Sequence, residues 1–277
     1  MSPSRYTERC FATGLNLRSL RKGISKTDGS RWMATDYDPI AEKYQRAKLQ
    51  PWRAHIESFT LGSLLGDLAG LDVVDLACGE GYYTRLLKQR GARKAVGVDL
   101  SAAMIDLARK QENAHPLGIE FVVGDARQLT LAEPFDVAVA AYLLNYATNR
   151  EELSAICRNV AHGLKPGGRF VAVNTNPGLD FLRAPSYRKY GVETSVRGEL
   201  REGAPITWTI HLDDGSFQIE NYYLNQSIHD EAFRAAGFRE IRWHNPRLSP
   251  QGEAEYGREF WTTFLDHPPV IFIECIK

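Results

Sequence analysis

The chain has 277 residues, of which 43% are hydrophobic and 25% charged, and this ordinary composition excludes a chain that is disordered throughout. Lys and Arg number 34, as do Asp and Glu, so no net charge favours nucleic acid or anionic lipid as a partner. No apolar stretch reaches the roughly 18 residues of a membrane-spanning helix, so we expect no membrane segment.

The first 32 residues differ from the rest of the chain. They are basic, carry several Ser and Thr and lack hydrophobic periodicity, whereas Met33 opens a more regular sequence. We expect 1–32 to be a flexible basic leader, either an over-long start or a transit peptide, and 33–277 to be the folded domain. We expect a cytoplasmic location, with organelle targeting as the alternative. The four single cysteines fit a reducing compartment, and no cluster of cysteines or histidines predicts a metal site.

From Tyr37 onward the pattern becomes regular. Apolar residues recur at helical spacing from Tyr37 to Tyr44 and again from Trp52 to Leu68, so two helices are predicted. Five short apolar runs then alternate with helical segments, at 71–77, 94–99, 119–125, 135–142 and 164–176. Strands that are apolar on both faces and separated by helices are typical of a parallel sheet covered on two sides. The sequence therefore predicts a doubly wound α/β fold.

After Asn176 this rhythm breaks. Residues 206–212 and 217–224 predict a β-hairpin with Asp-Gly in its turn. A helix ending at Gly237 and two strands, 239–244 and 269–275, complete the pattern. We expect 177–228 to be an insertion over the open edge of the sheet, on the side where the substrate binds.

The strongest motif follows the first predicted strand. Gly79 and Gly81 permit a sharp turn and close approach to a ligand, and the following helix points amide donors at that position. Asp99 ends the second strand, where a carboxylate can accept hydrogen bonds from both hydroxyls of a ribose. A nucleoside ligand is therefore indicated. The alternative interpretation is that the glycines only build a turn and that Asp99 only stabilises the next helix.

The residues around this motif favour a cofactor other than a dinucleotide. Thr84 occupies the third position of a GxGxxG pattern, after the bulky pair Tyr82 and Tyr83. Asp75 lies at the tip of the first strand, where its carboxylate would repel a pyrophosphate but would attract a cationic amino group. A nicotinamide-dependent oxidoreductase of the Rossmann type stays open as an alternative.

The segment DLACGEG at 75–81, in which Ala77 replaces a glycine, resembles motif I of the class I S-adenosylmethionine-dependent methyltransferases. The resemblance continues in order through Asp99, GDA at 124–126, the segment 135–147 and LKPGG at 164–168. It implies a mostly parallel seven-stranded Rossmann-like sheet with N-terminal capping helices and a β-hairpin insertion after strand five. It also implies S-adenosylmethionine as cofactor and methyl transfer as activity.

The resemblance assigns roles to particular residues. Asp99 would bind the ribose, Leu100 and Met104 would pack on the adenine, and Asp125 would accept from the adenine amino group. The residues implied to bind the cofactor are Tyr37, Tyr44, Asp75, Ala77, Cys78, Gly79, Gly81, Asp99, Leu100, Met104, Asp125, Ala126 and Tyr142. Cys78 is expected to be a packed side chain and not a nucleophile, because no base flanks it.

The segment AYLLN at 141–145 replaces the NPPY-type tetrad of nucleic-acid base methyltransferases, which favours a small-molecule acceptor with an N or O nucleophile. We expect in-line displacement with positioning as the main catalytic effect, and Tyr142, Asn145 and Tyr146 as the positioning residues. A wider acceptor wall would add Asn174, Asn176, Trp208, His211 and Tyr222, although the last three are also explained by hairpin packing or surface exposure.

A finer similarity, to toxoflavin-biosynthesis-type N-methyltransferases, rests on DYDPIAEKY, DLACGEGYYTRLL and AAYLLNYA. A non-catalytic S-adenosylmethionine-binding subunit remains a further alternative. The oligomeric state is left open between monomer and weak dimer.

Overall fold

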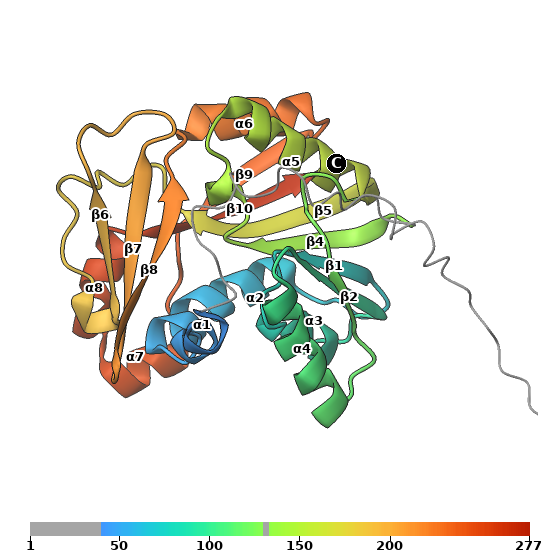
Figure 1. Cartoon of the computed structure of the whole chain (residues 1–277), viewed down its shortest axis with the longest axis horizontal. Helices are drawn as coiled ribbons and strands as arrows, with labels where there is room; N and C mark the ends of the chain where they lie inside the picture. The colour runs from blue at the N-terminus through green and yellow to red at the C-terminus, as the bar shows by residue number, and fades with distance from the viewer. Residues whose placement is uncertain (1–39, 130–132) are drawn as a thin grey trace, which may run out of the picture. The chain divides into compact units, whose positions relative to one another are not determined.

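A seven-stranded sheet forms the centre of the computed structural model, which describes residues 40–129 and 133–277 (Figure 1). The expected leader 1–32, its boundary at Met33 and Tyr37 lie outside these residues. The strand order is β3-β2-β1-β4-β5-β10-β9, and β10 runs antiparallel to both of its neighbours. The strands are β1 (Asp72–Leu76), β2 (Lys94–Asp99), β3 (Glu120–Val123), β4 (Phe135–Ala141), β5 (Leu164–Thr175), β9 (Glu240–His244) and β10 (Val270–Ile276).

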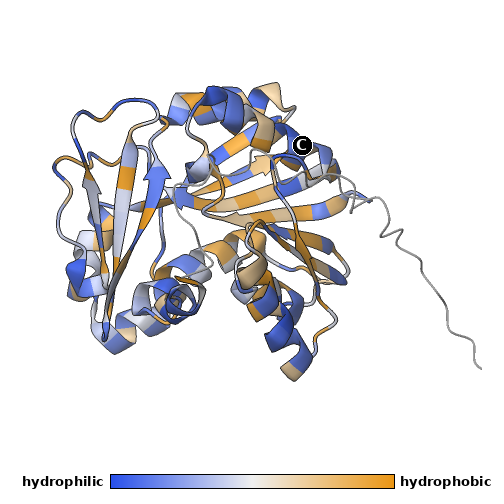
Figure 2. Cartoon of the chain, viewed as in Figure 1, coloured by the Kyte–Doolittle hydropathy of each residue, from blue (hydrophilic) through white to orange (hydrophobic). Residues whose placement is uncertain are grey.

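Helices cover both faces of this sheet. On one face lie α2 (Phe59–Leu65), α3 (Tyr82–Gln89) and α4 (Ala102–Ala114), and on the other lie α5 (Arg150–His162) and α6 (Gln226–Ala235) (Figure 1). Alternate strand residues therefore enter different cores: Val73 and Val137 belong to one, Val74 and Ala138 to the other. Because both faces are buried, the central strands are hydrophobic along their length (Figure 2). The predicted doubly wound fold is confirmed.

The helical segment before β1 is continuous from Pro51 to Leu65 and contains a π-helical stretch, η3 (Arg53–Ser58). It follows α1 (Ala41–Ala47). The segment ends at Leu65 and not at Leu68 as predicted, because Gly66 adopts a positive φ of 66° that a continuing helix does not allow. The two predicted helices are thus present, and the second is shorter than expected.

The insertion after β5 forms its own antiparallel sheet, which we call the small sheet. It consists of β6 (Val192–Val196), β7 (Pro205–Leu212) and β8 (Gly215–Tyr222), after a 3-10 turn η5 (Arg188–Tyr190). The predicted hairpin is confirmed, but Leu212 pairs with Gly215, so Asp213 and Asp214 form its turn in place of Asp-Gly. The strand β6 was not predicted.

The small sheet does not lie over an open edge of the large sheet, where the sequence placed it. The edge strands of the large sheet are β3 and β9, whereas the small sheet contacts α1 through β7 and the 3-10 turn η4 (Leu144–Tyr146) through β8. Since η4 follows β4, the small sheet lies at the carboxyl ends of the strands and not over an open edge (Figure 1). The reason is its direct connection to the carboxyl end of β5.

The segment between β9 and β10 holds two helices that the sequence did not predict. They are α7 (Pro250–Tyr256), capped by Ser249, and α8 (Arg258–Asp266), whose Trp261 is buried.

The helix α6 begins at Gln226 after its cap Asn225, so the expected insertion boundary at 228 falls inside it. Within residues 40–129 and 133–277, no helix is long and apolar enough to cross a membrane, and no group of three or more His, Cys, Asp or Glu could hold a metal ion.

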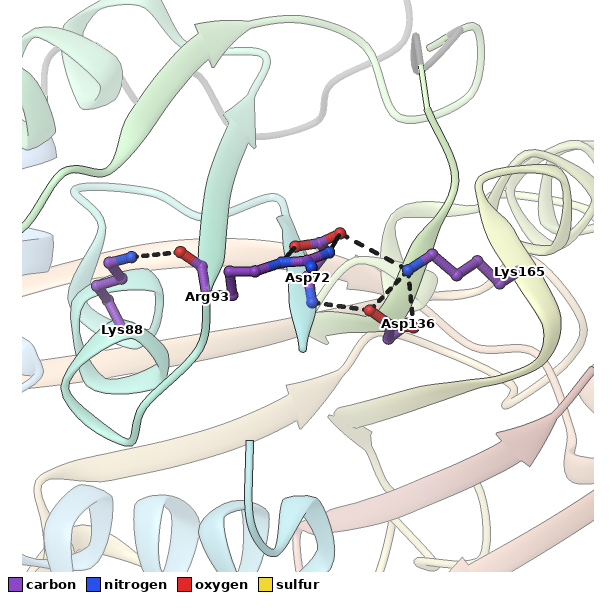
Figure 3. A network of polar contacts seen from close by, with 5 residues as sticks. All are labelled: Asp72, Lys88, Arg93, Asp136 and Lys165. Carbon is purple, nitrogen blue, oxygen red and sulfur yellow. Dashed lines mark hydrogen bonds and ion pairs between the residues drawn. The ribbon is translucent and has the colours of Figure 1, made fainter. Parts of the chain in front are cut away.

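A network of ion pairs joins the amino ends of the central strands (Figure 3). Arg93 Nη2 lies 2.6 Å from Asp72 Oδ2, and Lys165 Nζ lies 2.8 Å from both oxygens of Asp136. Asp136 also accepts from the backbone N of Asp72, and Lys88 Nζ donates to the carbonyl of Arg93. Each charged group drawn there has a partner.

Candidate active site

The loop between β1 and α3 contains three residues with a left-handed backbone. The φ angles are 59° at Ala77, 57° at Gly79 and 85° at Gly81. A Cβ at Gly81 would lie 2.6 Å from the ring of Phe121, so this position requires glycine. Ala77 accepts a conformation that costs a non-glycine residue about 1–2 kcal/mol. The strained loop ends at the N-terminus of α3, where free backbone N–H groups can meet a ligand.

Asp99 ties this loop to the second strand. Its Oδ2 accepts from the backbone N of Gly79 at 2.8 Å, and its Oδ1 accepts from the backbone N of Ser101 at 2.9 Å. Burial raises the pKa of its carboxyl group. A carboxylate has about four acceptor positions, so one bond on each oxygen leaves capacity for two further donors. The structural interpretation of Asp99 and its expected role at a ribose are therefore compatible.

Asp75 lies below the same loop, near the end of β1. It is 1% exposed, its Oδ2 accepts from Thr84 Oγ1 at 2.6 Å, and its Oδ1 has no partner among the described residues. Burial raises the pKa of the carboxyl group to about 7. A buried carboxylate oxygen without a partner suits a cationic group, and this observation fits the amino group of an amino-acid ligand.

Two other residues expected near a cofactor differ in accessibility. Leu100 is 41% exposed and free to contact a ligand, whereas Met104 is buried, with its sulfur about a van der Waals contact from the Cβ position of Gly79. Cys78 packs against Gly97 of β2, and burial raises the pKa of its thiol well above the usual value. The thiol therefore stays protonated, in agreement with a packing role.

The loop after β3 holds Asp125 and Ala126. The carboxylate of Asp125 forms a bidentate ion pair with Arg127, with distances of 2.9 Å from Nε and 2.7 Å from Nη2. Ala126 packs partly buried against the core, and its carbonyl accepts from Asn159. An adenine amino group would have to share Asp125 with Arg127.

The buried carboxylate of Glu57 connects α3, the helix that follows the glycine loop, to the end of β4. Glu57 is fully buried and accepts from Arg53 Nη1 at 2.9 and 2.6 Å, from the hydroxyl of Tyr83 and from the hydroxyl of Tyr142. We call these four residues the Glu57 cluster. Burial alone would raise the pKa of Glu57, but Arg53, Lys48 and the hydrogen bonds hold it below its usual value. Glu57 is therefore an anion that accepts hydrogen bonds.

The backbone around the Glu57 cluster is unusual. Arg53 and Glu57 lie on the π-helical stretch, a geometry that is frequent at functional sites. Tyr142 has a positive φ of 68°, which is rare for a bulky residue and indicates strain held by the surroundings. Burial, reinforced by the charge of Glu57, raises the pKa of the Tyr83 and Tyr142 hydroxyls well above the usual value, so both stay protonated.

A pocket lies between the small sheet and the carboxyl end of β4. It has about 20 Å³ of free volume and is partly open to solvent. The pleat of β7 and β8 turns alternate side chains toward it, and α1, η3, β4 and η4 complete the walls. The residues that line it are Tyr44, Arg53, Tyr142, Tyr146, Val192, Trp208, Ile210, Ile219 and Asn221. We call this space the acceptor pocket.

The acceptor pocket contains two of the three residues predicted to position an acceptor, Tyr142 and Tyr146. Asn145 is not among its lining residues. The backbone N of Asn145 donates to Asn174 Oδ1 at 3.0 Å, and its buried side-chain amide has no partner among the described residues. Tyr44, expected at the cofactor, lines the same pocket.

The other residues predicted for the acceptor wall also divide into those that line the pocket and those that do not. Trp208 lines the acceptor pocket, whereas His211 and Tyr222 alternate to the other face of the small sheet. His211 Nε2 lies 2.7 Å from Glu193, and the hydroxyl of Tyr222 donates to Glu220. Asn176 Nδ2 donates to the carbonyl of Pro268 and so holds a loop.

Sequence reasoning missed Arg53 and Glu57. Both are buried in the same helical segment as the apolar residues Ile56 and Leu61. A signal was present, because two opposite charges at i and i+4 interrupt an apolar stripe. Such a pair also occurs on solvated helix faces, and only its burial separates the two cases.

Comparison with known proteins adds the following similarities. Residues 73–168 match the family model of a methyltransferase domain. N-demethylindolmycin N-methyltransferase of Streptomyces griseus is 28% identical over 218 residues, which cover 76% of this chain and 90% of that protein. Cypemycin N-terminal methyltransferase of Streptomyces sp is 34% identical over 160 residues, which cover 57% of this chain and 62% of that protein.

Among solved structures, an S-adenosylmethionine-dependent methyltransferase from Mesorhizobium loti superposes with a TM-score of 0.58 at 23% identity. The match covers 83% of this chain and 100% of that one. This similarity supports the fold described above.

Proposed function

We propose a nitrogen atom of a small molecule as the methyl acceptor of this chain, which is a class I S-adenosylmethionine-dependent methyltransferase. One relative is named as an N-methyltransferase, that of N-demethylindolmycin, whereas two others are named as C-methyltransferases of ubiquinone and menaquinone biosynthesis. The first name supports nitrogen as the acceptor atom, and the choice between nitrogen and carbon rests on the acceptor pocket.

The residues around the glycine loop fit the cofactor. Asp99 would accept from the ribose hydroxyls with the capacity left on its two oxygens, and Asp75 would bind the cationic amino group through its free Oδ1. Leu100 would cover one side of the adenine. When bound, S-adenosylmethionine supplies a methyl group that its sulfonium already makes electrophilic.

The composition of the acceptor pocket carries the proposal. Its described lining includes no histidine and no carboxylate that could remove a proton from the acceptor. Burial, reinforced by the charge of Glu57, raises the pKa of Tyr142 and keeps it protonated, and Glu57 itself is engaged by Arg53 and two hydroxyls. An oxygen or carbon acceptor needs deprotonation, whereas a neutral nitrogen already has a free electron pair. The pocket therefore fits a nitrogen nucleophile best.

The protein would act mainly by positioning. Aromatic side chains from α1, β4, η4 and β7 can hold a flat acceptor and exclude water. We expect in-line displacement, because the described lining residues include no cysteine, serine or histidine that could form a covalent intermediate, and burial keeps Tyr142 protonated.

Methyl-labelled S-adenosylmethionine and a metabolite extract provide the test. We expect a labelled product whose label, located by mass spectrometry, is on nitrogen. A product labelled on oxygen or carbon would overturn the choice of atom. Cofactor binding without any labelled product would support a non-catalytic binding subunit, and binding of a nicotinamide cofactor in place of S-adenosylmethionine would support an oxidoreductase.

A further inference from the structure

Two residues that line different walls of the acceptor pocket each carry a buried donor atom with no partner among the described residues. Arg53 Nε comes from the π-helical stretch and Trp208 Nε1 from β7, and both atoms are buried. The two residues are only 5% and 6% exposed. Buried donors are nearly always hydrogen bonded, because desolvation without a partner is costly. Because both residues line one pocket, a ligand held there is the candidate source of the missing acceptor atoms.

The charges around the acceptor pocket define that ligand further. Arg53 is the one charged residue among the described lining residues. Glu57 engages only Nη1 of its guanidinium, which leaves the Nε side for a ligand. A second buried cation, Lys48, lies 5.1 Å from the ring of Tyr44. The positive charge of Lys48 acts to lower the pKa of Glu57 and also that of Asp75, which lies below the glycine loop.

We propose that the methyl acceptor carries an anionic oxygen group, such as a carboxylate, which Arg53 Nε and Trp208 Nε1 bind. Guanidinium and indole nitrogens only donate, so they recognise an acceptor and reject an ammonium group. Bonds from a cation to an oxyanion are also stronger than those to a neutral carbonyl. This inference rests on the proposed function, because it describes the substrate of that same pocket.

The oxyanion is an anchor and not the nucleophile. It would fix one end of a planar molecule between Arg53 and Trp208, with the ring against Tyr142 and Tyr146. A fixed end determines which atom of the ring faces the cofactor side of the pocket. The substrate class is thus an aromatic or heteroaromatic nitrogen compound with an acidic substituent.

Binding of three matched probes tests this assignment. 2-Naphthoate, 2-naphthamide and 2-naphthylmethylamine share a ring but carry an anionic, a neutral and a cationic group. We expect calorimetric titration of the protein saturated with S-adenosylhomocysteine to show naphthoate binding about tenfold or more tighter than naphthamide, and the amine weakest. Equal binding of naphthoate and naphthamide would overturn the inference.

Two variants locate the binding site. Trp208→Phe removes the indole N–H and keeps a ring, and we expect naphthoate affinity to fall about three- to tenfold. Arg53→Lys keeps the charge but loses the Nε donor, and we expect the preference for naphthoate to shrink. Trp243→Phe is the matched control, because that indole N–H on β9 already donates to Asp230. Naphthoate affinity that both test variants leave unchanged would place the anion elsewhere and overturn the assignment.

The same titrations separate the two proposals. A protein that binds S-adenosylhomocysteine but shows no preference for naphthoate refutes the oxyanion anchor alone. A well-folded protein that fails to bind S-adenosylhomocysteine refutes the methyltransferase assignment on which the anchor depends.

Discussion

The two ends of the central sheet use polar residues in opposite ways. At the amino ends, Asp72, Arg93, Asp136 and Lys165 form a network in which each charge has a partner (Figure 3). At the carboxyl ends, Glu57 is fully buried, and Asp75 and Arg53 keep polar atoms without a partner among the described residues. Satisfied surface charges contribute little energy, whereas unsatisfied buried ones are costly and persist where a ligand binds.

Backbone geometry follows the same division. The left-handed non-glycine residues among the described part of the chain are Ala77 and Tyr142, one after β1 and one after β4. Both stand at the carboxyl end, where open α/β sheets bind their ligands. Strain and unpaired polar atoms together therefore identify the functional end without reference to any relative.

The largest expected effect is on cofactor binding at Asp99. Replacing Asp99 by Ala removes two charge-assisted hydrogen bonds to the ribose, each worth roughly 1.5–3 kcal/mol. Affinity for S-adenosylhomocysteine should fall by about two to four orders of magnitude in calorimetric titration. Asp99→Asn, which keeps one acceptor oxygen, should retain more.

A thermal melt distinguishes the two roles of Asp99. Its bonds to the backbone N of Gly79 and Ser101 predict a lower Tm for Asp99→Ala in addition to weaker binding. Near-native affinity combined with a lowered Tm would show that Asp99 only holds the loop, and the ribose assignment would fail.

The next largest effect concerns the buried ion pair. Glu57→Gln leaves Arg53 buried without a counter-charge, and breaking such a pair costs about 3–5 kcal/mol of unfolding free energy. The double variant Arg53→Met, Glu57→Leu should lose less, because it removes both charges. Urea unfolding of the three proteins measures this difference. Wild-type stability in Glu57→Gln would show that the pair is not coupled as the structure indicates.

Cofactor binding should depend on pH through Asp75. Its pKa is raised to about 7 in the folded protein, so its contribution to stability is greatest below the unfolded pKa and is lost as pH rises toward 7. The ionised carboxylate binds an amino group, so affinity for S-adenosylhomocysteine should rise between pH 5.5 and 7, by up to about tenfold per pH unit.

The variant Asp75→Asn serves as the control for this pH dependence. It cannot titrate, so its affinity should be lower at pH 7 and nearly flat over the same range. A wild-type slope that survives in Asp75→Asn would assign the titration to another group.

The smallest effect is expected at the amino end of the sheet. Asp136→Asn removes the ion pair with Lys165 but keeps an oxygen for the backbone N of Asp72. We expect Tm to fall by at most a few degrees and affinity for S-adenosylhomocysteine to stay within about twofold. A large loss of binding would contradict the contrast between the two ends.

Local sequence alone determined the large sheet and the glycine loop. Short apolar strands separated by amphipathic helices have few other folded solutions, and Gly79, Gly81 and Asp99 lie near each other along a single strand-turn-helix-strand unit. Fold, strand sequence and expected cofactor contacts therefore followed from short-range patterns.

Tertiary structure alone decided the acceptor pocket. Arg53, Tyr142 and Trp208 come from three distant segments, and their meeting depends on where the insertion packs. The i,i+4 pair Arg53 and Glu57 has the same spacing as an exposed helix pair, so only burial shows it to be a costly internal charge pair. The register of β7 likewise decides that Trp208 faces the acceptor pocket and that His211 lies on the opposite face of the small sheet. Long-range packing and register are not encoded in local periodicity, and for that reason the sequence predicted a cofactor while the structure was needed to find the pocket for its substrate.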